Sequence, residues 1–263
     1  MLRLRLLSAL VMLPAAVAAA YLGSPVFDVM VAAFAAVMAW EWETICRGRF
    51  GTAGVILAIT GVAGALLAAA HPGLALAITA VGTIAAPVGG LPMASGERSV
   101  PGWLTAGAPY LVLPVIALVW LRAETGLGTL MWLLCVVWAT DIGAFICGRT
   151  LGGPRLAPRI SPKKTWSGAV GGLVAAVVVG LVAAVLLDLR PGLLALASAV
   201  TSVVSQVGDL LESWVKRRFD VKDSGSIIPG HGGVLDRVDG LLTAAPLVAA
   251  VVWLQGGGIM VWR

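Results

Sequence analysis

The sequence predicts an all-α integral membrane protein, and two observations carry this prediction. Hydrophobic residues make up 59% of the 263 residues and charged residues only 12%, which is about half the charge of a typical soluble domain. The apolar runs are long and continuous rather than alternating in strands of about ten residues, and this favours helices over a barrel. The three cysteines show no metal-ligand spacing, and their odd number argues against a disulfide framework.

Nine apolar segments follow one another along the chain, and most have about the 20 residues that a bilayer core requires. Turn-forming residues separate them, for example Gly23-Ser24-Pro25 and His71-Pro72-Gly73. The first segment also has features of a signal peptide, because Arg3 and Arg5 precede an apolar stretch, and we expect it to be retained as a helix. We therefore predict about nine transmembrane helices, at residues 4–22, 26–44, 52–70, 73–90, 104–121, 127–147, 168–188, 191–213 and 240–259.

Basic residues between these segments predict the orientation in the membrane. With the N-terminus in the cytosol, the cytosolic side receives 15 of the 18 lysines and arginines, and the far side only Arg122, Arg190 and Arg263. This asymmetry fits the positive-inside rule and requires an odd number of spans. The net charge of +5 therefore reflects topology and a site in the cytosolic loops, and we expect no nucleic-acid partner.

The most polar stretch, residues 205–239, lies between the last two apolar segments. Spacings of three and four predict one polar helix face, made of Ser205, Asp209, Glu212, Ser213 and Lys216. Asp236 and Asp239 stand three residues apart at the entry to the last segment, and both segments must return to the same side of the membrane. The acidic pairs can therefore converge, and convergent carboxylates favour a hard cation such as Mg²⁺. The alternative is that these acids form structural salt bridges with the arginines of the same stretch.

A glycine-rich run, Pro229-Gly230-His231-Gly232-Gly233, lies between the two acidic pairs. Glycines let the backbone approach a ligand closely and expose amide groups to anions. A histidine alone is more often a structural hydrogen-bonding residue than a catalyst, but the neighbouring aspartates make His231 a catalytic candidate.

The second polar region, residues 148–167, has five basic residues and no acid. Ser161-Pro162 can begin a helix with the serine as N-cap, and Lys163 and Lys164 beside a helix N-terminus suit phosphate. Asp141, on the preceding segment, is a further buried acid that can face the same cleft. Positive-inside bias is the alternative for this region, and it is preferred for Arg149, Arg155 and Arg159.

Together these features predict a cytosol-facing cleft at the membrane surface, with carboxylates for a divalent metal, lysines for phosphates and apolar walls. Such a cleft suits phosphoryl or nucleotidyl transfer to a lipid, chemistry that depends on positioning and charge neutralisation. The alternative from another class is a transporter that uses Asp141, Asp209 and Glu212 as an ion path. A transporter predicts acids at the bilayer midplane, whereas these acids lie near one edge.

The polar stretch contains four motifs without a gap over 27 residues: Ser213-x-x-Lys216-Arg217, Lys222-Asp223-x-Gly225, Ile228-Pro229-x-His231-Gly232-Gly233 and Asp236-Arg237-x-Asp239. This pattern resembles the signature of the phosphatidate cytidylyltransferases, also called CDP-diacylglycerol synthases. Upstream residues that fit the same family are Gln206-x-Gly208-Asp209-Leu210-x-Glu212-Ser213, Asp141, Gly148-Arg149 and Ser161-Pro162-x-Lys164-Thr165-Trp166. The resemblance covers residues 140–240, and the first 120 residues match only in being apolar helices.

The resemblance implies synthesis of CDP-diacylglycerol and pyrophosphate from CTP and phosphatidate, with Mg²⁺ as cofactor, by an all-helical homodimer. It implies Asp209 and Asp236 as metal ligands, with Asp239 close by as a third. Ser167 stands where the family has a glutamate, so no role of that carboxylate carries over. A CTP-dependent lipid kinase is the second enzyme hypothesis, with similar residues and a different product.

These considerations predict a multi-pass protein of a bacterial-type inner (plasma) membrane, with the N-terminus and the catalytic loops in the cytosol. Residues 1–122 are expected to form N-terminal transmembrane helices, and residues 123–263 a catalytic region with cytosolic loops 148–167 and 214–239. The predicted catalytic residues are Asp209, Asp236, Asp239, Lys222, Asp223 and His231. The predicted substrate-binding residues are Ser161, Lys163, Lys164, Thr165, Ser213, Lys216, Arg217, Arg237 and Asp141.

Overall fold

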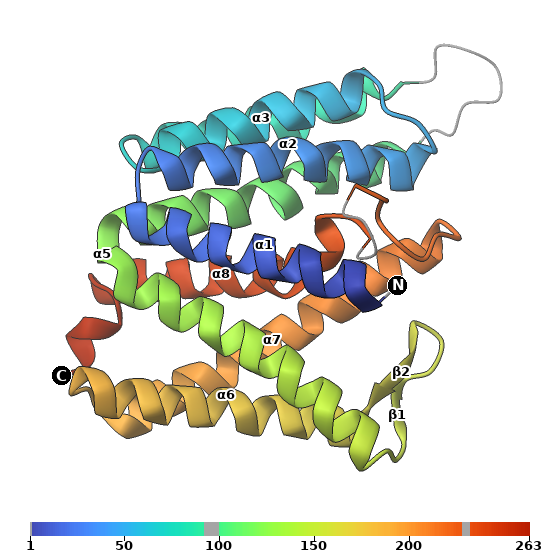
Figure 1. The fold of residues 1–263 in the computed structure, drawn as a ribbon. Helices are drawn as coiled ribbons and strands as arrows, with labels where there is room; N and C mark the ends of the chain where they lie inside the picture. Colours follow the sequence, from blue (N-terminus) through green and yellow to red (C-terminus); the bar gives the residue numbers. More distant parts are fainter. Residues whose placement is uncertain (1, 92–99, 228–231) are drawn as a thin grey trace. The chain divides into compact units, whose positions relative to one another are not determined.

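The computed structural model describes residues 2–91, 100–227 and 232–263, with side chains from Met12 onward. Helices dominate these residues (Figure 1), as the sequence predicts. They are α1 (Leu2–Leu22), α2 (Val26–Arg47), α3 (Thr52–Ala68), α4 (Pro72–Gly89), α5 (Pro101–Thr150), α6 (Trp166–Leu187), α7 (Pro191–Arg218) and α8 (Leu235–Gln255). A hairpin of β1 (Arg155–Ala157) and β2 (Ser161–Thr165) precedes α6, and the 3-10 helix η1 (Ile259–Trp262) follows α8.

Six of these helices are long and apolar enough to cross a membrane, within the residues described: α2, α4, α5, α6, α7 and α8. Two shorter apolar helices span Met12–Leu22 and Thr52–Ala68. The 50-residue α5 is two helices joined at Gly126, whose φ of 72° and ψ of −162° are not helical. This kink separates the two apolar segments that the sequence predicts on either side of it. The fold is thus that of an apolar, helical membrane protein, and nine crossings stay a prediction.

The chain packs as two units, and the divisions fall inside α5, α7 and α8. The first unit is Met1–Ala123 with Arg218–Val238, and the second is Glu124–Arg217 with Asp239–Arg263. Each unit has its own buried side chains and is described by itself. The predicted division of roles between residues 1–122 and 123–263 stays a prediction.

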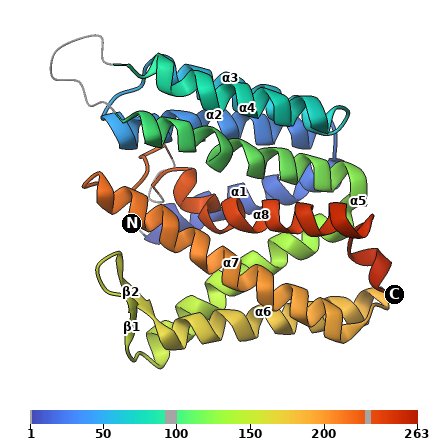
Figure 2. The same ribbon diagram turned by 180° about the vertical axis from the view of Figure 1, so that it is seen from behind.

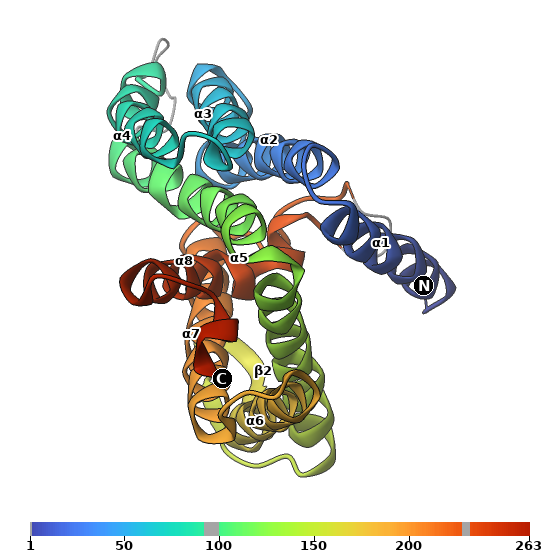
Figure 3. The same ribbon diagram turned by 90° about the vertical axis from the view of Figure 1, so that its left-hand side faces the viewer.

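In the first unit α2 packs along α3, and α3 along α4 (Figures 1 and 3). Small residues make this close approach feasible, as in membrane helices generally. A Cβ added at Gly61 would lie 2.9 Å from the Cβ of Ala35 on α2, and one added at Gly82 would lie 2.5 Å from Thr60 Oγ1. Glycine at these positions therefore sets the spacing between the three helices.

In the second unit α6 buries a small residue at every fourth position, namely Gly168, Gly172, Ala176, Gly180 and Ala184. A Cβ added at Gly143 of α5 would lie 2.7 Å from the carbonyl oxygen of Gly171 on α6. Polar side chains join α5 to α7, because Thr140 Oγ1 lies 2.9 Å from Ser202 Oγ in a buried hydrogen bond. Figure 2 shows α6 and α7 from the side opposite to Figure 1, with the hairpin at the start of α6.

The prediction that Ser161-Pro162 begins a helix is wrong. Residues 161–165 form β2, which pairs antiparallel with β1, and α6 begins later, at Trp166. The N-cap is Thr165, whose side chain accepts a hydrogen bond from the Gly168 amide at 3.1 Å. A proline is tolerated in β2 because both strands of a two-stranded hairpin are edges.

The boundaries of the last two helices also differ from the prediction. The helix α7 continues to Arg218 rather than residue 213, and α8 begins at Leu235 rather than residue 240. Charged residues at helix ends extend the helices beyond the apolar segments that define them in sequence. Asp236 therefore lies in the first turn of α8, where a negative charge is favourable to the helix dipole.

Candidate functional site

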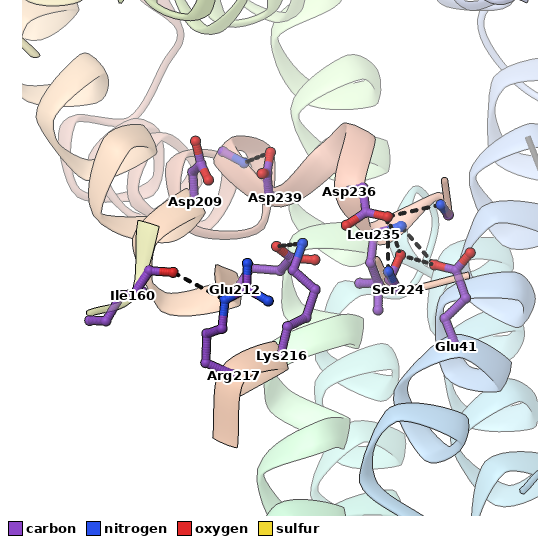
Figure 4. A network of polar contacts seen from close by, with 12 residues as sticks. Glu41, Ile160, Asp209, Glu212, Lys216, Arg217, Ser224, Leu235, Asp236 and Asp239 are labelled. Atoms are coloured by element: carbon purple, nitrogen blue, oxygen red, sulfur yellow. Dashed lines mark hydrogen bonds and ion pairs between the residues drawn. The ribbon is translucent and has the colours of Figure 1, made fainter. Parts of the chain in front are cut away.

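Four acidic residues gather in the second unit, one on α5, two on α7 and one on α8. They are Asp141, Asp209, Glu212 and Asp239. The charges of the other three repel that of Asp239, and Asp209 has the strongest effect among them. Asp209 and Asp239 lie beside each other in Figure 4. Two residues of the polar face predicted on α7, Asp209 and Glu212, thus belong to an acidic cluster that includes residues of two other helices.

Two lysines form ion pairs with this acidic cluster. The ammonium of Lys164, on β2, pairs with Asp209 Oδ2, and both side chains are 28% exposed. Lys216 Nζ lies 2.6 Å from Glu212 Oε2, and these side chains are only 11% and 4% exposed. The first pair is accessible to solvent ions and to a ligand, whereas the second is part of the packed interior of the unit. Lys216, predicted to bind substrate, serves in this structure as the counter-ion of Glu212.

The hairpin separates the two lysines that the sequence predicts as phosphate ligands. Successive side chains of a strand point to opposite faces, so Lys164 reaches Asp209 while Lys163 is exposed. Arg217 Nε donates a long hydrogen bond of 3.4 Å to the carbonyl oxygen of Ile160 (Figure 4), which ties the hairpin turn to α7. Ser161, next in the chain, is half-buried.

Ser167 has a local role in this hairpin. Its Oγ donates a short hydrogen bond to the Gly152 carbonyl oxygen and lies 2.9 Å from Thr165 Oγ1. Thr165, predicted to bind substrate, thus caps α6 and meets Ser167 at the same place. Ser167, which stands where the resemblance implies a glutamate, thus joins Gly152, before the hairpin, to Thr165 at its end.

The first unit contains a second polar centre, in the loop before α8. Asp236 Oδ2 accepts hydrogen bonds from the amide of Ser224 at 2.9 Å, from Ser224 Oγ at 3.0 Å and from the amide of Gly233 at 2.9 Å (Figure 4). Gly232 has a φ of +85°, and a Cβ there would lie 2.6 Å from Asp236 Oδ2. The loop therefore wraps closely around this carboxylate, and glycine is required for it to do so.

Sequence reasoning missed one residue of this centre, Glu41 on α2. Its carboxylate is fully buried and accepts hydrogen bonds from the amides of Val234 and Leu235 and from Ser224 Oγ. A signal was available, because an ionisable residue inside an apolar segment is a functional candidate by default. Spacing along the chain gave no indication of its partners, since the Glu41–Leu235 hydrogen bond joins residues 194 positions apart.

The other predicted site residues that the structure describes, in the loop before α8 and at the helix ends, are exposed or half-buried. Lys222 and Asp223 are exposed in the loop, Arg237 is exposed on α8, and Ser213 is half-buried on α7. His231 lies outside the described residues. The structure thus brings Asp141, Asp209 and Asp239 together in one unit, and places Asp236 in the polar centre of the other.

The acidic cluster has the donor chemistry of a site for a hard cation. In the parts of the chain that the structure describes, no three acidic, histidine or cysteine side chains converge closely enough to hold one ion. The donors are nevertheless all carboxylate oxygens, which Mg²⁺ prefers. A divalent cation would also offset the repulsion that Asp209 and Glu212 exert on Asp239. The residues fit Mg²⁺ in kind, and Asp209 and Asp239 are the two that lie beside each other in Figure 4.

The sequence is similar to that of a known protein family and of several named proteins. The sequence profile of the Cytidylyltransferase family matches residues 3–255. A Pseudomonas aeruginosa protein named phosphatidate cytidylyltransferase is 36% identical over 275 residues, which are 98% of this chain and 99% of that protein. Proteins of the same name from Brucella suis and Staphylococcus haemolyticus are 51% and 46% identical over shorter matches. The Brucella match covers 57% of each chain and the Staphylococcus match 47% of this chain and 48% of that protein.

Proposed function

Because the chain belongs to the cytidylyltransferase family, we propose that it transfers the cytidylyl group of CTP to phosphatidate, giving CDP-diacylglycerol and pyrophosphate. The observation that carries this proposal is the match to the Pseudomonas aeruginosa relative along almost the whole of both chains. The structure adds an acidic cluster, a basic hairpin in contact with it, and apolar helices suited to a lipid substrate.

The lipid phosphate is the nucleophile of this reaction. It is already ionised at neutral pH, so no strong general base is required. An oxygen of the phosphatidate phosphate attacks the α-phosphorus of CTP, and the bond from that phosphorus to the bridging oxygen of pyrophosphate breaks. Catalysis then depends on holding both phosphate groups in line and on offsetting their negative charge.

Basic residues that are at least partly exposed in each unit are the groups proposed to hold phosphates. Lys163, Lys164, Lys222 and Arg237 each offer charge-assisted hydrogen bonds to phosphate oxygens. Lys164 is partly exposed in its pair with Asp209, so it can exchange this carboxylate for a phosphate without unfolding the hairpin. Lys216 and Arg217 act instead on the protein, through Glu212 and the Ile160 carbonyl.

Asp209 and Asp239 would hold Mg²⁺, and metal ligation by Asp236 stays an expectation from the family signature. The ion supplies neutralisation of the charge that develops on the triphosphate. Release of Asp209 from Lys164 would provide this carboxylate to the metal and the ammonium to the nucleotide. The two partners of the ion pair thus have complementary roles once CTP binds.

The membrane setting is part of the proposal. The relatives are bacterial proteins, and the chain has six helices suited to crossing a membrane, within the described residues. We place the protein in the inner membrane as a homodimer, with its N-terminus, the hairpin and the loop before α8 in the cytosol. The acyl chains of phosphatidate can then stay in the bilayer while its phosphate reaches the cytosolic site.

An acceptor assay tests this function against a lipid kinase and a transporter. Purified protein in detergent is incubated with Mg²⁺, CTP and either phosphatidate or diacylglycerol, and the lipid products are identified by mass spectrometry. We expect CDP-diacylglycerol from phosphatidate and no reaction with diacylglycerol. Phosphatidate formed from diacylglycerol would identify a CTP-dependent kinase, and absence of CTP consumption with either lipid would favour ion transport.

A further inference from the structure

A buried carboxylate of α2 holds the beginning of α8. Glu41 Oε1 accepts a hydrogen bond from the Val234 amide at 2.7 Å. Glu41 Oε2 accepts one from the Leu235 amide at 2.8 Å (Figure 4). Leu235 is the first residue of α8, so these donors belong to the helix N-terminus. A helix N-terminus carries partial positive charge and amides without partners in the helix. The Glu41 carboxylate, on α2, accepts hydrogen bonds from two of these amides and offsets the positive charge.

The same carboxylate is connected to Asp236 through one hydroxyl group. Ser224 Oγ lies 3.2 Å from Glu41 Oε2 and 3.0 Å from Asp236 Oδ2. A serine hydroxyl has a single proton to donate, so it can serve only one of the two acids at a time. The charges of Glu41 and Asp236 also repel each other, so the Ser224 hydroxyl and the α8 amides hold together two acids that would otherwise separate.

Two signature glycines make room for this arrangement. A Cβ at Gly225 would lie 2.9 Å from Glu41 Oε1. A Cβ at Gly233 would come closer still, both to this oxygen and to Ser224 Oγ. The loop between α7 and α8, which contains both glycines, therefore packs closely around the Glu41 carboxylate as well as around Asp236.

A neighbouring glutamate on α2 provides a comparison. Glu43 is equally buried, and its Oε2 accepts hydrogen bonds from the amides of Gly51 and Gly54, each at 2.7 Å. Its Oε1 pairs with Arg47 at 3.0 Å. Glu43 thus caps α3 much as Glu41 caps α8, but none of these partners belongs to the signature.

We propose that Glu41 is a positioning residue for cytidylyl transfer, which fixes Ser224 and the first turn of α8 and thereby orients Asp236. This inference rests on the proposed function for its catalytic part, and on the hydrogen bonds of Glu41 for its structural part. Glu41→Gln keeps the size of the side chain and removes the negative charge. It also replaces one acceptor oxygen with an NH2 group, which cannot accept a hydrogen bond from the amides or the hydroxyl that contact Glu41. The loop before α8 is then held less firmly, because its hydrogen bonds to Glu41 are weakened or lost, and the Asp236 side chain is no longer fixed in one orientation.

The test compares Glu41→Gln with Glu43→Gln in the full-length, detergent-solubilised protein. For Glu41→Gln we expect kcat to fall roughly 10- to 100-fold, the usual loss when a supporting partner of a site residue is removed. We expect Glu43→Gln to keep kcat within about twofold of the unchanged protein, because only interactions that act on the transition state lower kcat. Thermal unfolding of each variant gives the fraction that is folded, and rates are expressed per folded molecule.

Hydrogen exchange measured by mass spectrometry gives a second readout, which does not depend on activity. Glu41→Gln should speed exchange of the amides in residues 232–240 and leave residues 50–56 unchanged, while Glu43→Gln should do the reverse. Equal effects of the two variants on kcat, or faster exchange in both segments for both variants, would overturn the inference. If the unchanged protein transfers no cytidylyl group, the proposed function fails, and the exchange data still decide whether Glu41 fixes the loop.

A milder variant covers the case in which Glu41→Gln does not fold. Ser224→Ala removes the hydroxyl between the two acids but leaves the Val234 and Leu235 amides on Glu41. We expect a smaller fall in kcat and faster exchange in the same segment, residues 232–240. If both variants fold, the double variant Glu41→Gln/Ser224→Ala should lose less in the logarithm of kcat than the sum of the two single losses. Residues of one hydrogen-bond network do not act independently. Additive losses would contradict a shared role.

Discussion

The ammonium group of Lys164, on β2, forms an ion pair with the carboxylate of Asp209, on α7. The pair joins the basic hairpin to the acidic cluster, two regions that the sequence predicts separately. It is partly exposed, and exposed pairs of this kind contribute little to stability. The contact therefore matters more for the substrates that would replace it than for the fold.

Removing the positive charge of Lys164 should weaken CTP binding. A hydrogen bond to a charged group contributes about 1.5–3 kcal/mol, so Lys164→Met should raise KM for CTP roughly tenfold or more. Steady-state kinetics over a range of CTP concentrations measure this change. Arg159→Met is the matched control, because it removes one charge from the exposed turn of the same hairpin and should leave KM nearly unchanged. An equal rise in both variants would indicate a general effect of charge on the hairpin.

Removing the charge of Asp209 should abolish turnover and preserve folding. Asp209→Asn keeps the shape of the side chain and removes a hard-cation ligand. Because the side chain is 28% exposed, Lys164 can turn to solvent when its partner is lost. We expect the same outcome for Asp236→Asn, in which the amide oxygen still accepts hydrogen bonds from the loop. Specific activity and thermal unfolding measure the two effects, and near-normal activity in either variant would contradict metal ligation by that residue.

Glu212 provides the opposite case within the same cluster. Its pair with Lys216 is buried, and removal of one partner of a buried ion pair typically destabilises a protein by about 3–5 kcal/mol. Glu212→Gln should therefore lower the unfolding temperature markedly, while Asp209→Asn should not. Thermal unfolding in one detergent compares the two variants directly. Equal stability of both variants would mean that the Lys216 pair is not part of the packed core.

The predicted topology places residues 226 and 190 on opposite sides of the membrane. Both are exposed, in the loop before α8 and between α6 and α7 respectively. In a background with all three cysteines replaced, Arg190→Cys should react with an impermeant thiol reagent in cells whose outer layers admit it, and Ser226→Cys should react only after the membrane is opened. Labelling of Ser226→Cys but not of Arg190→Cys in intact cells would contradict the predicted orientation and indicate the opposite one.

Several helix boundaries were predictable because their signals are local. Pro72 and Pro191 begin α4 and α7, as proline in a first helical turn allows, and the periodic acids of α7 identified one face of the cluster. Ser161 misled the prediction because serine and proline also suit the edge strand that is found there. Glu41 escaped notice because its partners come from the opposite end of the sequence. Local patterns therefore predicted the helices and the acids, while the support of the α8 N-terminus depends on tertiary packing.

The most direct measurement of the proposed reaction follows the phosphorus atoms of CTP. The purified protein is incubated with phosphatidate, Mg²⁺ and CTP labelled at either the α- or the γ-phosphorus, and the label is separated into lipid and water phases. We predict that the α-label enters a chloroform-soluble lipid, with release of an equal amount of pyrophosphate, and that EDTA stops both. A γ-label that enters the lipid while the α-label stays in water-soluble CDP would contradict cytidylyl transfer and identify a kinase.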